Sequence, residues 1–136
     1  MKKLILILFL ATIYSCNKSQ TTSSQEEKKI EIRSIKIGDF EVMLYPTYVM
    51  SWYDAKQYEK SLGNGWRLPT KEEFELLKTN QPTLNSKRSL INGGYWVSTE
   101  LSETLAWQST FEFGYLEEFY SKNTPASVIF IKSLNK

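Results

Sequence analysis

The residues of this chain that could perform general acid–base chemistry are its carboxylates, because the sequence contains no histidine and a single cysteine, Cys16. Serine–histidine, cysteine–histidine and histidine–metal sites are therefore excluded. The nearest candidates for a carboxylate-based hydrolase are the adjacent pairs Glu72–Glu73 and Glu117–Glu118. Neighbouring residues of a helix or strand point to different sides, so neither pair places two carboxyl groups across one substrate bond. We expect no enzymatic activity, and such a hydrolase is the remote alternative.

A calcium site of the kind that binds sugars would need several oxygen ligands around a proline in a loop. The nearest stretch is Gln81-Pro82-Thr83, which has no acidic residue close by and stands where a helix is expected to end. We therefore expect neither a metal ion nor a cofactor.

Aromatic and polar residues around one predicted turn have the types that bind glycans without a metal. Aromatic faces stack on sugar rings, and carboxylates accept hydrogen bonds from hydroxyl groups. The candidates are Tyr115, Glu117, Glu118, Tyr120, Lys122 and Asn123. In the other interpretation the tyrosines pack at a sheet edge, since aromatic residues at alternate strand positions usually belong to the core.

A second candidate surface is the polar loop predicted over residues 83–94, which contains Lys87, Arg88 and Asn92. These residues could bind an anionic polymer. In the other interpretation they are solvated side chains of a surface loop.

The stretch NGWRLPTKEEF, residues 64–74, joins two predicted helices. Trp66 is expected in the core, Pro69 holds the preceding residue extended, and Thr70 caps the second helix. Arg67 lies in a partly buried turn, where a guanidinium needs a fixed partner. We expect that partner to be the carboxylate of Asp54. The stretch is therefore interpreted as structural, together with Trp52, Trp96 and Trp107.

The elements that must position these residues follow from periodicity. Alternation over residues 30–37 and 40–45 predicts a hairpin. Helices are predicted from Ser51 to a stop at Gly63 and from a capping box at Thr70 to a stop at residues 80–82. Strands are predicted over residues 95–99, 106–113, 115–120 and 128–131, the last as a central strand. This order indicates an α+β domain with an antiparallel sheet.

The N-terminus has the layout of an export signal. Lys2 and Lys3 precede an apolar run over residues 4–13, which is shorter than the roughly 20 residues of a membrane-spanning helix. Residues 13–16 (IYSC) resemble a lipobox, with Tyr14 bulkier than the usual residue, and predict that Cys16 carries acyl chains such as palmitate. The alternative is an ordinary secretory signal. We assign residues 1–15 to a lipoprotein signal peptide, 16–29 to a flexible tether and 30–136 to one domain.

The charge balance argues against a nucleic-acid partner. The chain has 17 Lys and Arg and 15 Asp and Glu, and removing Lys2 and Lys3 with the signal leaves 15 of each. A nucleic-acid-binding domain would carry a basic stripe.

Four blocks occur in order: residues 50–55 (MSWYDA), 65–70 (GWRLPT), 95–99 (YWVST) and 106–107 (AW). Over residues 45–134 the chain resembles the bacterial Lcl C-terminal domain family, found at the C-terminus of collagen-like surface proteins. The resemblance implies a C-type-lectin-like fold with two helices on a small antiparallel sheet, and a binding or adhesion module of the cell envelope. Such domains usually carry an arginine in the last strand, where Phe130-Ile131-Lys132 stands here.

Together these observations predict a lipid-anchored module that binds a glycan or a protein without catalysis. The alternative is a structural or assembly lipoprotein that binds another envelope protein through its sheet edge. The expected location is the bacterial outer membrane, facing the periplasm or the cell surface.

Overall fold

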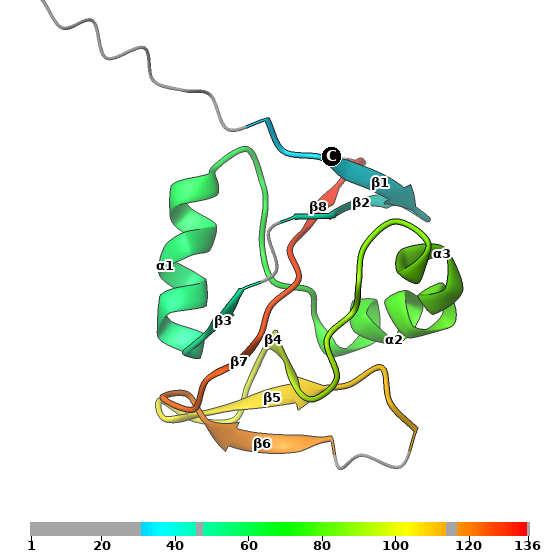
Figure 1. Ribbon diagram of the computed structural model, residues 1–136. Coiled ribbons are helices and arrows are strands. Elements are labelled where there is room, and N and C mark those ends of the chain that lie inside the picture. Colours follow the sequence, from blue (N-terminus) through cyan, green and yellow to red (C-terminus); the bar gives the residue numbers. More distant parts are fainter. Residues whose placement is uncertain (1–30, 46–47, 114–116, 136) are drawn as a thin grey trace, which may run out of the picture. The chain divides into compact units, whose positions relative to one another are not determined.

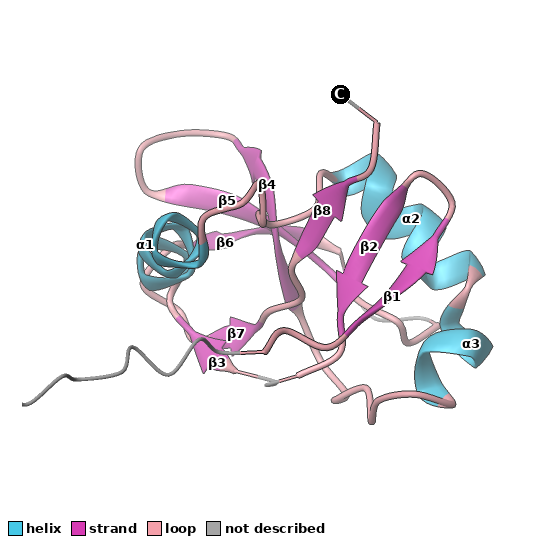
Figure 2. Cartoon of the chain, turned by 90° about the horizontal axis from the view of Figure 1, so that it is seen from above, coloured by secondary structure: helices cyan, strands magenta, loops and turns pink. Residues whose placement is uncertain are grey.

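The N-terminal hairpin forms as the alternation of its residues predicts. The computed structural model describes residues 31–45, 48–113 and 117–135, beginning with β1 (Ser34–Ile37) and β2 (Phe40–Met43), which pair antiparallel. β8 (Ile131–Ser133), near the C-terminus, pairs with the other side of β2. The first and last strands therefore share one three-stranded sheet, β1-β2-β8 (Figures 1 and 2).

The second sheet has five strands in the order β3-β7-β4-β5-β6. They are β3 (Val49–Met50), β4 (Tyr95–Glu100), β5 (Leu105–Ser109), β6 (Glu118–Ser121) and β7 (Ala126–Ser127). β4 and β7 pair parallel, and the other pairs are antiparallel. β5 ends earlier than the strand predicted over residues 106–113, and β6 pairs back on it as predicted. The sheet leaves β3 and β6 at its edges.

The first helix, α1 (Trp52–Leu62), begins and ends where the sequence predicts. The Ser51 hydroxyl accepts a hydrogen bond from the Asp54 amide and donates one to its carboxylate. After the helix the chain has positive φ at Gly63 (59°), Asn64 (52°) and Gly65 (80°). This left-handed stretch reverses the chain, and glycine adopts it at little steric cost.

The second helix, α2 (Lys71–Thr79), has the predicted capping box, in which Thr70 and Glu73 satisfy each other's backbone amides. A third helix, α3 (Gln81–Asn85), follows directly. The interpretation of Pro82 as a helix stop was therefore incomplete. Proline lacks an amide hydrogen and suits the first turn of a helix, so Pro82 also begins α3.

Two apolar clusters form the core, one beside α1 and one beside α2. The α1 cluster contains Met43, Trp52, Ala55, Trp66, Leu68, Trp96, Ala106, Ala126, Val128 and Phe130. The α2 cluster contains Ile37, Phe40, Val42, Phe74, Leu77, Leu84, Tyr95, Val97, Phe111, Ile129 and Ile131. In Figures 1 and 2, α1 lies on one side of the strands and α2 and α3 on the other.

The apolar run over residues 128–131 is not the central strand that was predicted. It crosses from β7 to β8, and its side chains alternate between the α1 cluster and the α2 cluster. The Phe130 carbonyl accepts from the Met43 amide, and the Arg67 and Ile131 backbones exchange two hydrogen bonds. An extended segment buried on both faces has the same apolar pattern as a central strand, which explains the error.

The fold is α+β, as predicted, but it has a third helix and a second, mixed sheet. Within the described ranges, no helix has the length and apolar character needed to cross a membrane. The predicted signal peptide, the predicted lipidation site at Cys16 and the predicted tether fall outside the described residues, and so does Tyr115.

Candidate functional site

Arg67 links the start of α2 to the last strand, β8. Its guanidinium donates two hydrogen bonds of 2.7 Å to the Glu73 carboxylate, one to the Leu68 carbonyl and one of 3.1 Å to the Ser133 hydroxyl. The expected pairing with Asp54 is wrong, because the Asp54 side chain binds Ser51 at the start of α1. These hydrogen bonds make Arg67 part of the structural framework.

The other residues of the structural motif are also held by the fold. Trp66 and Pro69 are buried, and the Pro69 carbonyl accepts from Ser98. The indole of Trp52 donates to the Val97 carbonyl, and that of Trp96 donates to the Met50 carbonyl. Trp52, Trp66, Trp96 and Ala106, one residue from each of the four blocks that carry the family resemblance, all belong to the α1 cluster.

β6 separates the residues of the predicted glycan site. Glu117, which directly precedes β6, binds Lys78 of α2. Tyr120, on β6, is half-buried against the α1 cluster. The two side chains therefore contact different parts of the domain. Asn123 is exposed in the turn after β6.

Lys122, adjacent to Asn123, is buried with a side-chain exposure of 3%. Its ammonium binds the Glu100 carboxylate, donates to the Ser102 carbonyl and lies 4.2 Å from the centroid of the Trp52 ring. These partners fix the loop after β4 against α1.

The loop cations Lys87 and Arg88 differ in exposure. Lys87 is exposed, whereas Arg88 is 2% exposed and donates a hydrogen bond of 2.8 Å to the Met43 carbonyl. Burial lowers the pKa of Arg88. The interpretation of Arg88 as a solvated loop residue is therefore wrong; it ties the segment after α3 to β2. Asn92 is exposed.

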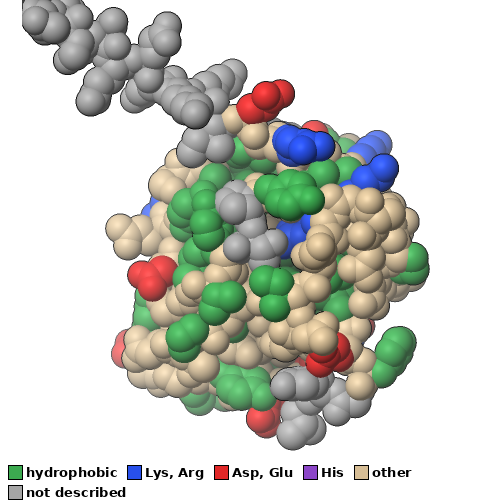
Figure 3. All heavy atoms as spheres, viewed as in Figure 1, with side chains coloured by type: hydrophobic (Ala, Val, Ile, Leu, Met, Phe, Trp, Pro, Cys, Tyr) green, Lys and Arg blue, Asp and Glu red, His purple; other side chains and the backbone are tan. Residues whose placement is uncertain are grey.

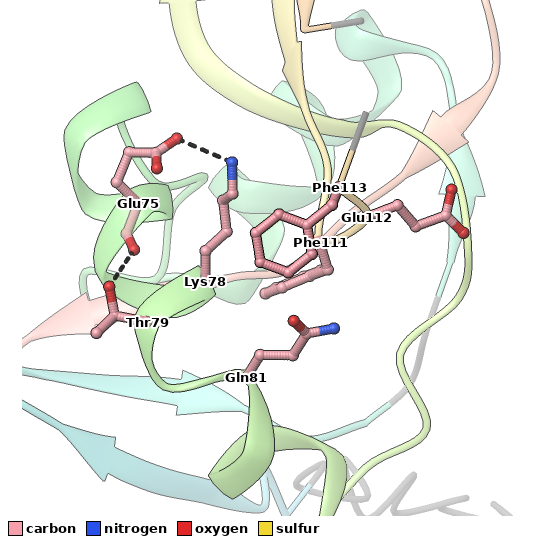
Figure 4. A pocket seen from close by; sticks show the side chains of 7 residues that line it. All are labelled: Glu75, Lys78, Thr79, Gln81, Phe111, Glu112 and Phe113. Carbon is pink, nitrogen blue, oxygen red and sulfur yellow. Dashed lines mark hydrogen bonds and ion pairs between the residues drawn. The ribbon is translucent and has the colours of Figure 1, made fainter. Parts of the chain in front are cut away.

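The most distinctive surface feature is a pocket of about 300 Å³ beside the end of α2. We call it the Phe113 pocket; it is lined by Glu75, Lys78, Thr79, Gln81, Phe111, Glu112 and Phe113 (Figure 4). Phe111 is 5% exposed and packs against Phe74 and Tyr95, at ring-centroid distances of 4.8 and 5.1 Å. Phe113, two residues on, is fully exposed at 102%. The pocket therefore combines a rigid aromatic wall with an aromatic ring in solvent.

Polar groups surround these rings. Figure 4 shows the Gln81 amide beside Phe111 and Phe113, while the Glu112 carboxylate points away from the other labelled side chains. The Lys78 ammonium lies 2.7 Å from Glu117 and 3.3 Å from Glu75. Burial opposes the charged form of Lys78, but the hydrogen bonds and charges of Glu117 and Glu75 outweigh it and raise its pKa. The Lys78 ammonium is therefore a hydrogen-bond donor at the pocket whose charge is balanced by Glu75 and Glu117.

Sequence reasoning missed most of this pocket. Lys78 and Gln81 carry no motif, and their position beside Phe111 depends on how α2 packs against β5. Phe113 follows the same alternation as Phe111, so periodicity placed both on one buried face. The strand ends at Ser109, and this early end leaves Phe113 in solvent.

A second, larger groove of about 710 Å³ lies beside Arg67 and is lined by Asn64, Gly65, Arg67, Lys132, Ser133 and Leu134. Its two cations are bound to Glu73 and Glu41, and no aromatic ring lines it. Binding sites are marked by aromatic surface and by polar groups that converge on the ligand. This groove lacks the aromatic surface, so it is the weaker candidate for a ligand site than the Phe113 pocket.

Within residues 31–45, 48–113 and 117–135, no three acidic, histidine or cysteine side chains gather in a way that could hold a metal ion. No protein-family model matches the chain, and no curated protein is significantly similar to it.

Proposed function

We propose that this protein is a lipid-anchored binding module of the cell envelope, which recognises a glycan through the Phe113 pocket and catalyses no reaction. The single observation that carries the proposal is the fully exposed ring of Phe113 beside the buried wall of Phe111. A single exposed aromatic ring is not by itself a binding site, but an exposed ring next to an aromatic wall in a pocket with polar groups is the kind of surface on which a ligand ring packs.

The polar groups of the pocket favour a sugar as the ligand. The apolar C–H face of a sugar ring packs on an aromatic ring, and its hydroxyl groups exchange hydrogen bonds with amides, carboxylates and ammonium groups. The pocket presents such groups from Gln81, Glu75 and Lys78. Because Lys78 is already paired with two glutamates, the pocket suits hydroxyl groups better than a strongly charged ligand.

The arrangement of the carboxylates supports binding without catalysis. Hydrolysis of a glycosidic bond uses two carboxyl groups on either side of that bond. Glu75 and Glu117 instead converge on one ammonium group, that of Lys78, and Glu73 is held by Arg67. These contacts engage the carboxylates in structural ion pairs.

A C-type-lectin-like fold of the Lcl C-terminal type is part of the proposal. The pairing of the first and last strands with β2, and a second sheet with the helices beside it, support this assignment. The lipid anchor is proposed at Cys16, and the location is the outer membrane, facing the periplasm or the cell surface.

The second candidate function is an assembly lipoprotein that binds another envelope protein. The observation in its favour is β6, an edge strand whose outer side can pair with an extended segment. A flat apolar patch would favour this function further. On the face in Figure 3, however, hydrophobic side chains emerge at several separate places among polar and charged ones.

A glycan array probed with the full-length chain in mild detergent tests the primary function. We expect binding of one group of related neutral glycans, and loss of that binding in Phe113→Ala. Leu101→Ala is the matched control, because Leu101 is also exposed (60%) but does not line the pocket. Absence of glycan binding, with clean capture of one envelope protein, would decide for the assembly function.

A further inference from the structure

An aromatic shelf lies on the same side of the second sheet as the Phe113 pocket. Trp107 on β5 and Phe119 on β6 are directly opposite in the antiparallel register. Their ring centroids are 4.9 Å apart with the planes at 81°, and both side chains are half-buried. The sheet therefore presents a second aromatic surface near its β6 edge.

The shelf continues into the pocket along one flank of α2. The indole nitrogen of Trp107 donates to the hydroxyl of Ser109, the last residue of β5, and Phe111, the wall of the pocket, lies two residues beyond it. Glu117 directly precedes β6, two residues before Phe119, and binds Lys78, which also lines the pocket. Both connections lead from the shelf to the pocket, and we call the shelf, these residues and the pocket one strip.

α2 runs beside this strip. Its Lys71 ammonium lies 3.7 Å from the centroid of the Trp107 ring, and Lys78 lies at the pocket. The two lysines are about two helical turns apart, which corresponds to about 10 Å along the axis. This span exceeds a single sugar ring, so one ligand covering both surfaces must be a chain.

The charges along the strip indicate whether the polysaccharide ligand is neutral or anionic. Lys78 is neutralised by Glu75 and Glu117, and the charge of Lys71 rests on the Trp107 ring. An anionic polymer would meet Glu75 and Glu117, whereas a neutral one needs only ring faces and hydrogen-bond partners.

We propose that the Phe113 pocket and the Trp107–Phe119 shelf form one elongated site for a neutral polysaccharide chain. One sugar unit packs at Phe113, and another packs on Trp107 after displacing Lys71. Lys71 covers the ring while the site is empty, and it must move before a sugar can stack there. This inference rests on the proposed glycan-binding function and extends it.

The test is isothermal titration calorimetry of the full-length chain in mild detergent. The probes are β-1,4-, β-1,3- and α-1,4-linked glucose oligomers of one to six units, with oligogalacturonides of equal length as the anionic comparison. For at least one neutral series we expect affinity to rise at least about tenfold between one and four units, the size of one added aromatic contact. Trp107→Ala should abolish this increase and leave the affinity for short oligomers unchanged.

A second variant keeps the test decisive if Trp107→Ala does not fold. Lys71→Ala removes the ammonium that covers the ring, so it should tighten binding of the longer neutral oligomers about two- to fivefold, the equivalent of one exposed cation–π contact. Lys71→Ala should leave the affinity for single sugars unchanged. The control Leu101→Ala should leave the affinity for oligomers of every length unchanged.

Equal affinity for short and long oligomers, with binding that depends on Phe113 but not on Trp107 or Lys71, would overturn the elongated site and leave the proposed glycan function standing. Tighter binding of the oligogalacturonides than of every neutral series would also overturn it. If no sugar binds, either in this titration or on the glycan array, both the elongated site and the proposed function fail.

Discussion

The guanidinium of Arg67 and the carboxylate of Glu73 are joined by two parallel hydrogen bonds of 2.7 Å. Glu73 also closes the capping box of α2, and Arg67 reaches Ser133 next to the C-terminal end of β8. One residue pair therefore links the start of a helix to the last strand. Bidentate pairs of this kind are among the strongest polar contacts in proteins. The guanidinium and the carboxylate therefore stabilise the fold.

Replacing Arg67 with alanine should lower the free energy of unfolding by about 2 kcal/mol, because four hydrogen bonds are lost and the half-buried Glu73 carboxylate loses its partner. Urea unfolding followed by tryptophan fluorescence measures this change. Asp54→Ala is the control and should lower the free energy of unfolding less, since the Asp54 carboxylate accepts its hydrogen bond from Ser51 at an exposed helix start. Equal losses in the two variants would contradict the assignment, as would loss of glycan affinity in folded Arg67→Ala.

Stability should also depend on pH through Glu73. The hydrogen bonds from Arg67 lower the pKa of Glu73, against the opposing effect of burial. A carboxyl whose pKa is lowered by folding contributes stability above its unfolded pKa, about 4.3, and loses that contribution as the pH falls through the folded value. The stability difference between the wild type and Glu73→Gln should therefore shrink between pH 6 and pH 2. Parallel curves for the two proteins would show that the pair contributes nothing through ionisation.

The buried ammonium of Lys122 makes Glu100 a sensitive position. Glu100→Ala should lower the free energy of unfolding by about 2 kcal/mol, because the Lys122 ammonium, whose side chain is 3% exposed, loses its carboxylate partner. The exposed Glu103 provides the control, and Glu103→Ala should change stability by less than about 0.5 kcal/mol. The double variant Lys122→Met/Glu100→Ala should recover most of the loss, since an apolar side chain of similar length removes the buried charge. Thermal unfolding measures these changes. If the double variant is no more stable than Glu100→Ala, the loss of stability comes from packing and not from the unpaired charge.

The local elements of the fold could be predicted from sequence. The Thr70–Glu73 capping box, the start of α1 at Ser51 and the β1–β2 hairpin each depend on residues a few positions apart. Their physics is local, so a single sequence contains the necessary signals.

One error is local: Arg67 pairs with Glu73, six residues along the chain and part of the capping box, and not with the more distant Asp54. The other errors concern contacts between distant segments. Arg88 and Lys122 have ordinary polar neighbours in sequence, and their burial depends on distant partners, among them the Met43 carbonyl for Arg88 and the Ser102 carbonyl and Glu100 carboxylate for Lys122. The Phe113 pocket was missed for the same reason, since α2 and the segment after β5 contribute its walls from separate parts of the chain.

The proposed lipid anchor at Cys16 leads to a prediction that does not depend on the domain. Cys16→Ser should release the protein from membranes into the soluble fraction of expressing cells, because the thiol that would carry the acyl chains is gone. Metabolic labelling with radioactive palmitate, followed by membrane fractionation, measures both modification and location. A Cys16→Ser protein that stays in the membrane fraction would exclude lipidation at Cys16 as the anchor.

The measurement that tests the central claim most directly is NMR mapping of the ligand site on the full-length chain, with side-chain and amide signals assigned. A neutral glycan from the array is titrated into the isotope-labelled protein. The glycan-binding account predicts saturable shifts at Phe113, Phe111, Gln81 and Lys78, no shifts at the distant control Leu101, and loss of all shifts in Phe113→Ala. Saturable shifts that avoid the Phe113 pocket, or that persist unchanged in Phe113→Ala, would contradict it.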